Sequence, residues 1–263
     1  MKKKKYEVTN PNHISSIIIA KNEEDNIRLC IESQLKCIDD IVVIIDSKST
    51  DKTLEIVKEY EKVKFEIAEW QGYAGTKQFA LTLVKYNWVL WIDADEEITE
   101  ELCEELNAFK KTTPSFSAYS LARRAFFLGK WIKHSGWYPG RVVRLFNKNK
   151  AKFSSNDVHE FLEVDGETGK LKNDINHYTD PNIHHYFEKF NIYTTLAAAE
   201  LSKTNKTANL TDLLLRPTFL FIKMFFIRRG FLDGLHGFIL AVFSSTYVFV
   251  KYLKLWEIQK QNK

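Results

Sequence analysis

Cysteine is scarce in this sequence, and its scarcity argues against two kinds of site. The 263 residues contain three cysteines, Cys30, Cys37 and Cys103. The number is odd and no Cys-x-x-Cys pair occurs, so neither a disulfide framework nor a cysteine zinc site is indicated. A reducing cytosol is the natural compartment for a chain of this kind.

A dominant charge sign and an apolar leader are also lacking. Lysine and arginine number 38 against 34 aspartates and glutamates, and the net charge of +4 is too small to indicate a nucleic acid partner. Four lysines follow Met1, but residues 6–11 bring no apolar core of the kind that a signal peptide needs. We therefore expect no nucleic acid and no export. The lysine run is interpreted as a solvated tail, with contact to anionic lipid as the alternative.

No uninterrupted apolar run reaches the length that spans a bilayer. Two strongly apolar stretches, residues 213–227 and 238–250, each fall short of about 20 residues. Cations interrupt or flank them: Arg216, Lys223, Arg228, Arg229, Lys251 and Lys254. Such segments suit helices that lie in the membrane interface with their cations at the phosphate head groups. A helical hairpin packed on the rest of the chain, or a dimer interface, is the alternative.

The length favours one catalytic domain with a full core. We divide the chain into a basic tail at residues 1–12, a catalytic domain at 13–205, and a C-terminal amphipathic, membrane-associating helical region at 206–263. On this division the protein is cytoplasmic and peripheral on the inner face of the membrane.

Strand-like and helix-like patterns alternate through the first half of the chain. Predicted strands are Ile14 to Ala20, Ile41 to Asp46, Val63 to Ala68 and Trp88 to Asp93; predicted helices are Glu24 to Leu35, Asp51 to Tyr60 with Ser49 or Thr50 as its cap, Thr76 to Lys85, and Glu100 to Phe109. Unbroken apolar strands between helices predict an α/β fold with a mainly parallel sheet covered on both faces.

Polar residues follow three of these strands. They are Lys21-Asn22-Glu23, Asp46-Ser47-Lys48 and Asp93-Ala94-Asp95. Ligands of parallel sheets bind beyond the carboxyl ends of the strands, so these side chains are expected to share one crevice. Two carboxylates one residue apart can hold Mg²⁺ or Mn²⁺ against a diphosphate. Taken singly, each group could instead start a helix, form a turn or cap a helix.

Four segments together resemble a known enzyme family. They are Ala20-Lys21-Asn22-Glu23-Glu24, the stretch from Asp46 to Thr53, Gly75-Thr76-Lys77-Gln78, and the stretch from Asp93 to Glu97. Their order resembles the inverting family 2 glycosyltransferases with the GT-A nucleotide-sugar-binding fold. Residues 140–146 followed by Val158-His159-Glu160, and residues 228–234, look like the bacterial branch that includes the lipopolysaccharide inner-core glucosyltransferases.

The resemblance implies roles for the strand-end residues. Asn22, Glu23 and Asp46 would recognise the ribose and base of a nucleotide sugar, and Ala94 would lie against it. Lys77 would lie along the nucleotide, although the family usually has Gln-Lys-Asn where this chain has Thr76-Lys77-Gln78; a surface lysine is the alternative. Asp95 is expected to be the direct metal ligand, with Asp93 towards ribose or a bound water and His177 completing the shell.

The acceptor side needs a base, because an inverting transfer deprotonates the attacking hydroxyl. Glu160 is the predicted base and His159 its partner in orienting the acceptor or a phosphate; a structural His–Glu hydrogen bond is the alternative. Arg141 and Arg144 are three apart on a predicted strand and so face opposite sides, one suited to phosphate and the other to the surface. His184 and His185 are assigned to the start of a helix from Ile183 to Leu201.

These observations predict a metal-dependent transfer of a hexose, by resemblance glucose, from a UDP-sugar to a lipid-linked saccharide such as the lipopolysaccharide or lipooligosaccharide core. Two other classes stay open. A nucleotidyltransferase would usually carry a glycine- and cation-rich loop after its first strand, which Lys21-Asn22-Glu23-Glu24 is not. A non-catalytic membrane scaffold would have no use for Asp93, Asp95 and Glu160 together.

Overall fold

The computed structural model describes residues 12–154, 161–204 and 206–261. Contacts divide the chain into two compact units, one of Met1–Arg123 with Arg141–His177 and one of Arg124–Gly140 with Tyr178–Lys263. Helix α5 (Ile183–Lys203) thus belongs to the unit of the C-terminal helices. The functional boundary predicted at residue 206 stays a prediction, and the basic tail lies almost wholly outside the described residues.

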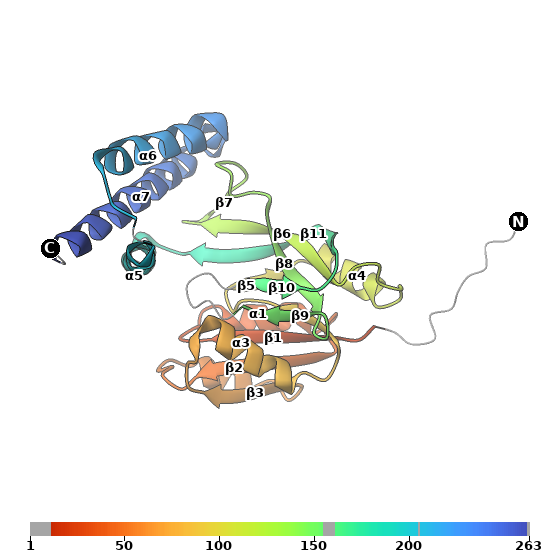
Figure 1. Ribbon diagram of the computed structural model, residues 1–263. Coiled ribbons are helices and arrows are strands. Elements are labelled where there is room, and N and C mark those ends of the chain that lie inside the picture. The colour runs from red at the N-terminus through yellow and green to blue at the C-terminus, as the bar shows by residue number, and fades with distance from the viewer. Residues whose placement is uncertain (1–11, 155–160, 205, 262–263) are drawn as a thin grey trace, which may run out of the picture. The chain divides into compact units, whose positions relative to one another are not determined.

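The first unit opens with a parallel β/α succession. Its elements are β1 (Ile14–Ala20), α1 (Ile27–Gln34), β2 (Asp40–Asp46), α2 (Thr53–Lys58), β3 (Val63–Ala68), α3 (Gly72–Leu83), β4 (Trp88–Trp91), β5 (Glu96–Ile98) and α4 (Glu100–Phe109) (Figure 1). Strands β3, β2, β1 and β4 lie side by side in that order and all run parallel. The predicted strands β1 and β3 and the helix α4 agree with the structure residue for residue.

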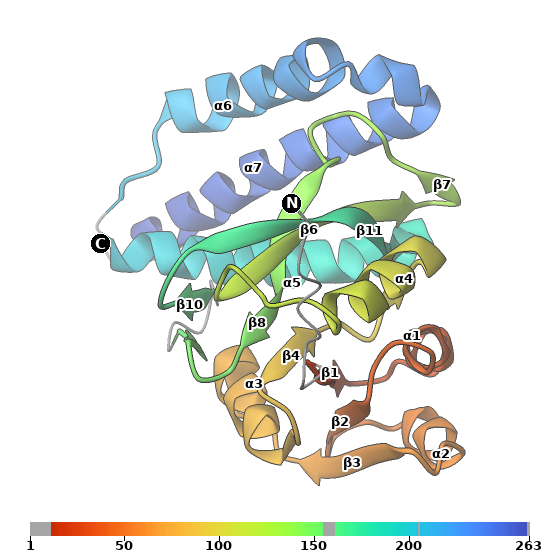
Figure 2. The same ribbon diagram turned by 90° about the vertical axis from the view of Figure 1, so that its right-hand side faces the viewer.

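Helices cover both faces of these strands, as the apolar runs predict. Figure 2 shows α3 on one side of β1–β3 and α1 and α2 on the other. Residues such as Ile18 and Val43 pack with α1, α2 and α4, whereas Ile17 and Val42 pack with α3. Since neighbouring residues of one strand point to opposite faces, the strand must be apolar throughout.

The remaining strands extend the same sheet beyond β4. They are β6 (Ala118–Phe127), β8 (Gly140–Asn147) and β11 (Thr168–Asp180), and the sheet continues from β4 through β8, β6 and β11 to β5. Strand β8 pairs with β4, with Leu145 opposite Leu90, and β11 pairs with β5, with His177 opposite Glu96. Strands β9 (Ala151–Phe153) and β10 (Leu162–Val164) form a separate hairpin. These long-range pairings bring the second half of the chain to the end of β4.

Three predicted helix starts differ from the structure. Helix α1 begins at Ile27, three residues after the predicted Glu24. Helix α2 begins at Thr53 after Lys52, and no side chain caps it, so neither Ser49 nor Thr50 is its cap. The hydroxyl of Ser49 instead accepts from the backbone N–H of Asn22. Helix α3 begins at Gly72, four residues before the predicted start. The loop before α2 thus bonds to the loop after β1 rather than to its own helix. At α3 the Thr76 hydroxyl accepts from the backbone N–H of Gln71, which precedes the first turn.

The second unit is mainly helical. It contains β7 (Lys130–Trp131), α5, α6 (Leu210–Ile222), the π-helical turn η1 (Lys223–Ile227), the 3₁₀ turn η2 (Gly230–Asp233) and α7 (Leu235–Gln261). Helix α7 packs against both α5 and α6. His184 and His185 lie in the first turn of α5, as predicted, beside Glu188 and Asp180 respectively.

Helix α7 corrects the prediction that no C-terminal segment is long enough to span a bilayer. It has 27 residues and, by length and composition alone, could cross a membrane. Only 22% of its most apolar stretch is buried. The helix continues past Lys251 and Lys254. The Lys254 ammonium donates to acceptors on α5, among them the carbonyl oxygen of Asn191 at 3.0 Å. The helix is roughly 40 Å long at 1.5 Å per residue.

Gly237 on α7 provides a test of the packing in the second unit. A Cβ atom at this position would lie 1.9 Å from the carbonyl oxygen of Gly230, so Gly237→Ala must push α7 away from η2. We expect the free energy of unfolding to fall by about 1–3 kcal/mol, as overpacking of a close contact does. Urea denaturation measures it. Thr246→Ala, at an exposed position of α7, is the matched control, and an equal loss in both variants would contradict this packing.

Candidate active site

The loops that follow β1 and β2 are joined to each other at the carboxyl edge of the sheet. Asn22 accepts from the backbone N–H of Thr50 through Oδ1, and its own N–H donates to Ser49 Oγ. Glu23 and Glu24 donate their backbone N–H groups to Thr53 Oγ1 and Asp51 Oδ2. Asn22 has a φ of 53°, which bends the chain sharply after β1. Two of the three predicted strand-end groups are therefore brought together.

Asp46 is a buried carboxylate at the end of β2. Its Oδ1 accepts from the backbone N–H of Lys48 at 2.9 Å, and its Oδ2 lies 3.1 Å from the Lys21 ammonium. Burial by itself raises the pKa of the Asp46 carboxyl, but the Lys48 amide and Lys21 outweigh it and hold the pKa below its usual range. The bond to Lys48 closes a turn, which is the alternative role that the sequence allowed for Asp46. The ion pair with Lys21 links Asp46 to the loop after β1.

Asp93, at the end of β4, is held by two neighbouring side chains. Trp91 donates its indole N–H to Asp93 Oδ1 at 3.0 Å, and Arg144 Nη2 donates to Asp93 Oδ2 at 2.5 Å. Burial raises the pKa of the Asp93 carboxyl, but the charges of Arg144 and Lys77 lower it further than burial raises it. Asp93 is therefore a charged anchor within the protein, with both oxygens already in use.

Arg144 is almost wholly buried, at 2% exposed. Its Nη2 also donates to Glu96 Oε1 at 2.6 Å, and Glu96 Oε2 accepts from the backbone N–H of Asp93. Burial raises the pKa of the Glu96 carboxyl. Arg141 is exposed and donates to the carbonyl oxygens of Ser120 and Leu171. One of the two arginines thus lies at the surface, as predicted, and the buried one pairs with two carboxylates.

Trp91 carries two cations on its ring. The Lys77 ammonium lies 3.4 Å and the Arg144 guanidinium carbon 4.1 Å from the ring centroid. Lys77 is 3% exposed, so the alternative of a surface lysine is wrong. Because the ring face is electron-rich, it stabilises both charges close to Asp93. Phe153, the last residue of β9, packs edge-on against the same ring.

Asp95 and His177 lie side by side. His177 Nε2 is 3.3 Å from Asp95 Oδ2, and both side chains are partly buried. The sheet register explains the contact, because Asp95 immediately precedes β5 and His177 lies opposite Glu96 on β11. Two of the three predicted metal ligands are thus adjacent. A carboxylate oxygen and an imidazole nitrogen suit Mn²⁺, although no cluster of three or more candidate ligands occurs within residues 12–154, 161–204 and 206–261.

Four carboxylates converge on one buried thiol. Burial raises the pKa of Cys30 on α1 well above its usual value, and Glu96, Asp95, Asp93 and Glu23 each raise it further. Ala94 is buried in the core on the same side of the sheet. The acidic residues after β1 and β4 therefore all act on the Cys30 thiol.

His159 and Glu160 lie outside the described residues, so their predicted roles stay predictions. The residues on either side are held together: Ser154 N–H donates to the Phe161 carbonyl, and Phe161 N–H donates to Ser154 Oγ. Ser154 follows Phe153, which contacts Trp91. Ser154, the last residue described before this segment, thus follows a residue that packs on the ring that binds Lys77 and Arg144.

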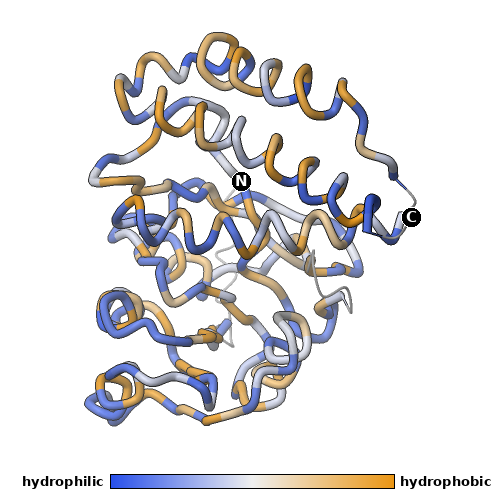
Figure 3. The backbone as a smooth tube through the Cα atoms, turned by 90° about the vertical axis from the view of Figure 1, so that its left-hand side faces the viewer, coloured by the Kyte–Doolittle hydropathy of each residue, from blue (hydrophilic) through white to orange (hydrophobic). Residues whose placement is uncertain are grey.

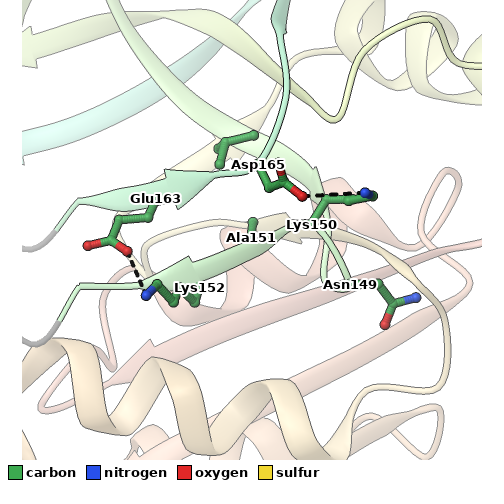
Figure 4. Close-up of a pocket in the computed structure, with 7 residues that line it drawn as sticks. Asn149, Lys150, Ala151, Lys152, Glu163 and Asp165 are labelled. Carbon is green, nitrogen blue, oxygen red and sulfur yellow. Dashed lines mark hydrogen bonds and ion pairs between the residues drawn. The ribbon is translucent and has the colours of Figure 1, made fainter.

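A hollow on the β9–β10 hairpin contains none of the predicted site residues (Figure 4). The ion pairs Lys152–Glu163 and Lys150–Asp165 cross it at 2.9 and 3.4 Å. Both pairs are exposed and fill the hollow with their own charges, so we assign it no ligand.

Sequence reasoning missed Glu96 and the role of Arg144. The acidic pair Glu96-Glu97 directly after Asp95 was visible, but nothing local distinguishes a buried glutamate from a solvated one. Arg144 lies within Arg-Val-Val-Arg-Leu-Phe, whose apolar residues are compatible with a buried strand. Only the pairing of β8 with β4 places its guanidinium beside Asp93.

Comparisons with known proteins agree on one family. Residues 15–233 match the model of glycosyl transferase family 2. The lipopolysaccharide core biosynthesis glycosyltransferase LpsC of Rhizobium meliloti is 30% identical over 250 residues, 93% of this chain and 92% of that protein. An uncharacterized glycosyltransferase of Rickettsia typhi is 31% identical over 261 residues, 95% of this chain and 89% of that protein.

One solved structure supports the fold. A mannosyltransferase of Pyrobaculum calidifontis, in complex with GDP-mannose and Mn²⁺, superposes with a TM-score of 0.56 at 13% identity, covering 95% of this chain and 88% of that chain. At this identity the likeness concerns the fold alone.

Arg144→Met tests the buried ion pairs. It removes the cation that bonds to both Asp93 and Glu96, and only Arg123, 3.6 Å from Glu96, remains within ion-pair distance of either carboxylate among the residues described. We expect a loss of about 3–5 kcal/mol in the free energy of unfolding at pH 7. Arg141→Met is the matched control on the same strand, because the partners of Arg141 within the described part of the chain are carbonyl groups. Urea denaturation of both variants measures the difference.

The pH dependence of that loss provides a second readout. The folded-state pKa of Asp93 is lowered, so its stabilising effect is present above the unfolded pKa of about 3.9 and is lost as the pH falls below it. The gap between wild type and Arg144→Met should therefore narrow below about pH 4. A gap that is constant from pH 7 to pH 3 would contradict the ion pair.

Proposed function

The chain belongs to glycosyl transferase family 2 and is a glycosyltransferase of the GT-A fold, and from this premise we propose its reaction. It transfers a hexose, by our first choice glucose, from a UDP-sugar to a lipid-linked saccharide such as the lipopolysaccharide core, with inversion at the anomeric carbon. Family membership sets aside the nucleotidyltransferase and the non-catalytic scaffold. The name of the Rhizobium relative supports the class of acceptor.

The contact between Asp95 and His177 carries the proposal. One oxygen and one nitrogen ligand, 3.3 Å apart at the carboxyl edge of a parallel sheet, fit a divalent cation such as Mg²⁺ or Mn²⁺. Such a cation, when bound, neutralises the charge that develops on the departing diphosphate. Asp95 is its direct ligand in our proposal, and His177 is the second.

Asp93 supports this ligand pair from within the protein. Its oxygens already accept from Trp91 and Arg144, so its main task is to fix the backbone that leads to Asp95. A carboxylate keeps further lone pairs, which leaves room for the predicted contact with ribose or a bound water. Arg144 Nε and Nη1 are buried and have no hydrogen-bond partner among the residues described. Oxygens of a sugar diphosphate would satisfy them.

The loops after β1 and β2 suit the nucleoside. Glu23 and Asp46 would bind the ribose and the base, with Asn22 holding the two loops together. Lys77, buried on the Trp91 ring, would donate hydrogen bonds to the diphosphate or uracil oxygens. Ala94, whose side chain is buried in the core, would meet the nucleotide through its backbone.

The transfer step needs one more group. The acceptor hydroxyl oxygen forms a bond to the anomeric carbon while the bond from that carbon to the UDP oxygen breaks, and the hydroxyl proton passes to the Glu160 carboxylate. UDP leaves with the bonding electrons. His159 would orient the acceptor, in keeping with its place next to Glu160.

A lipid-linked acceptor requires a place at the membrane. We propose that the protein is cytoplasmic and peripheral on the inner face, attached through its C-terminal helices. In Figure 3 the tube of α6 and α7 is orange over several turns, with short blue stretches between them. The exposed apolar surface of α7 supports this attachment.

Calorimetric titration with UDP-glucose, UDP-galactose, UDP-N-acetylglucosamine and GDP-mannose, each with and without Mn²⁺, tests the donor and the metal together. We expect one UDP-sugar to bind, and only with Mn²⁺. Asp95→Ala should abolish that metal-dependent binding while leaving the circular dichroism spectrum unchanged. Glu100→Gln, an exposed acid in the first turn of α4, is the control. Metal-dependent binding that survives in Asp95→Ala would remove the metal assignment.

Glu160→Gln tests the base. It keeps the size of the side chain but cannot take a proton, so kcat should fall by at least about 100-fold. Donor binding should remain close to wild type in the same calorimeter, because Glu160 acts on the acceptor. Glu163→Gln on β10 is the nearby control. A Glu160→Gln enzyme with unchanged kcat would assign the base elsewhere.

A further inference from the structure

The turn between α6 and α7 exposes a dense set of large apolar side chains. We define residues 223–235 as the tip of the second unit. Its exposed apolar residues are Phe226 at 56%, Ile227 at 63%, Phe231 at 49%, Leu232 at 55% and Leu235 at 68%. Five such residues within ten positions form an apolar patch, which soluble surfaces seldom carry without a partner.

The charge around this patch has one sign. Between Leu213 and Trp256 the sequence has six lysines and arginines and one acid, Asp233. Asp233 is 2% exposed, so it presents no charge to a partner. Three of the cations, Lys223, Arg228 and Arg229, lie within the tip and are exposed.

Hydrogen bonds to Asp233 bring further cationic side chains to the tip from another part of the chain. Its carboxylate accepts from the backbone N–H and the imidazole Nδ1 of His134, at 2.8 and 3.0 Å, and from the backbone N–H of Lys133. Lys130 donates from its ammonium to the Asp233 carbonyl at 2.9 Å. These bonds tie the loop after β7 to η2, which brings the exposed Lys130 and Lys133 to the base of the tip.

The tip is also fixed in shape. The backbone N–H of Ser135 donates to the Arg228 carbonyl, and Gly237 packs within van der Waals distance of the Gly230 carbonyl. Arg229 adopts a left-handed conformation with a φ of 55°, which turns the chain between η1 and η2. The apolar side chains are therefore held outward by a built turn.

We propose that the tip is a docking surface for anionic phospholipid, with its apolar side chains in the acyl boundary and its cations among the phosphate head groups. An apolar patch with a rim of one charge sign matches the interface of an anionic bilayer. A second copy of this chain fits less well, because a symmetric contact would bring Arg228 and Arg229 against the same residues of the partner. The inference rests on the proposed lipid-linked acceptor, since it places the enzyme where that acceptor is embedded.

Co-sedimentation of the full-length chain with vesicles tests the proposal. We expect tighter binding to vesicles that contain phosphatidylglycerol than to phosphatidylcholine alone. Arg228→Gln with Arg229→Gln should weaken binding to the anionic vesicles about 30-fold, because each cation near such a surface contributes roughly a factor of five. Ile227→Ser with Leu232→Ser should weaken binding to both kinds of vesicle.

Matched controls come from exposed residues of the first unit. Ile67→Ser, at 53% exposed, repeats the apolar change, and Lys58→Gln with Lys62→Gln repeats the loss of two exposed cations. Both controls should bind as wild type does. Tip variants that bind like the controls, or wild type that does not prefer anionic vesicles, would overturn the proposal.

A fluorescent label distinguishes lipid from self-association. The native cysteines are buried, so an environment-sensitive dye attached at Leu232→Cys reports on the tip, with Ile67→Cys as reference. A blue shift on adding anionic vesicles, seen only at Leu232→Cys, supports the proposal. A blue shift that depends on protein concentration without vesicles would assign the patch to a second copy and overturn it.

Donor titration in the same preparations separates the two proposals. If Mn²⁺-dependent donor binding is intact and vesicle binding is absent, the docking surface is wrong and the transferase assignment stands. If vesicles bind through the tip but no donor does, the proposed donor is wrong and the docking surface stands.

Discussion

The buried guanidinium of Arg144 is the interaction on which the candidate site depends. It reaches Asp93 at the end of β4 and Glu96 at the start of β5, so one cation spans both ends of the segment that presents Asp95. A buried arginine is costly unless it is paired, and here the pairs fix the turn in the sheet. Trp91 supports the arrangement by bonding to Asp93 and by stacking beneath the charge.

In this arrangement Asp93 and Asp95 have different roles. Asp93 faces protein donors and stays charged, whereas Asp95 faces His177, its neighbour across the β5–β11 pairing. A site that needs one well-placed carboxylate thus uses another to hold the backbone still. Preorganisation of this kind lowers the cost of fixing ligands when the nucleotide sugar binds.

The second unit uses a buried carboxylate in a similar way, for shape rather than chemistry. Asp233 gathers backbone and side-chain donors from the loop after β7, and the only acid between Leu213 and Trp256 is thereby withdrawn from the surface. What remains outside is apolar and cationic. A chain with a net charge of only +4 therefore carries a strongly one-signed region.

The sequence by itself determined the local elements and the gathering of Asp46 and Asp93 at one sheet edge, because apolar periodicity fixes strands and parallel strands share their carboxyl ends. It also predicted that one of Arg141 and Arg144 lies at the surface, and Arg141 does. It did not determine where β8 and β11 insert, since those pairings join residues some fifty to eighty positions apart. Tertiary structure alone decided that Arg144 bonds to Asp93, that Glu96 is buried, and that Lys77 is buried against the ring of Trp91. Buried charges are paired by the packing of strands that are distant in the sequence, and no local sequence pattern predicts that packing.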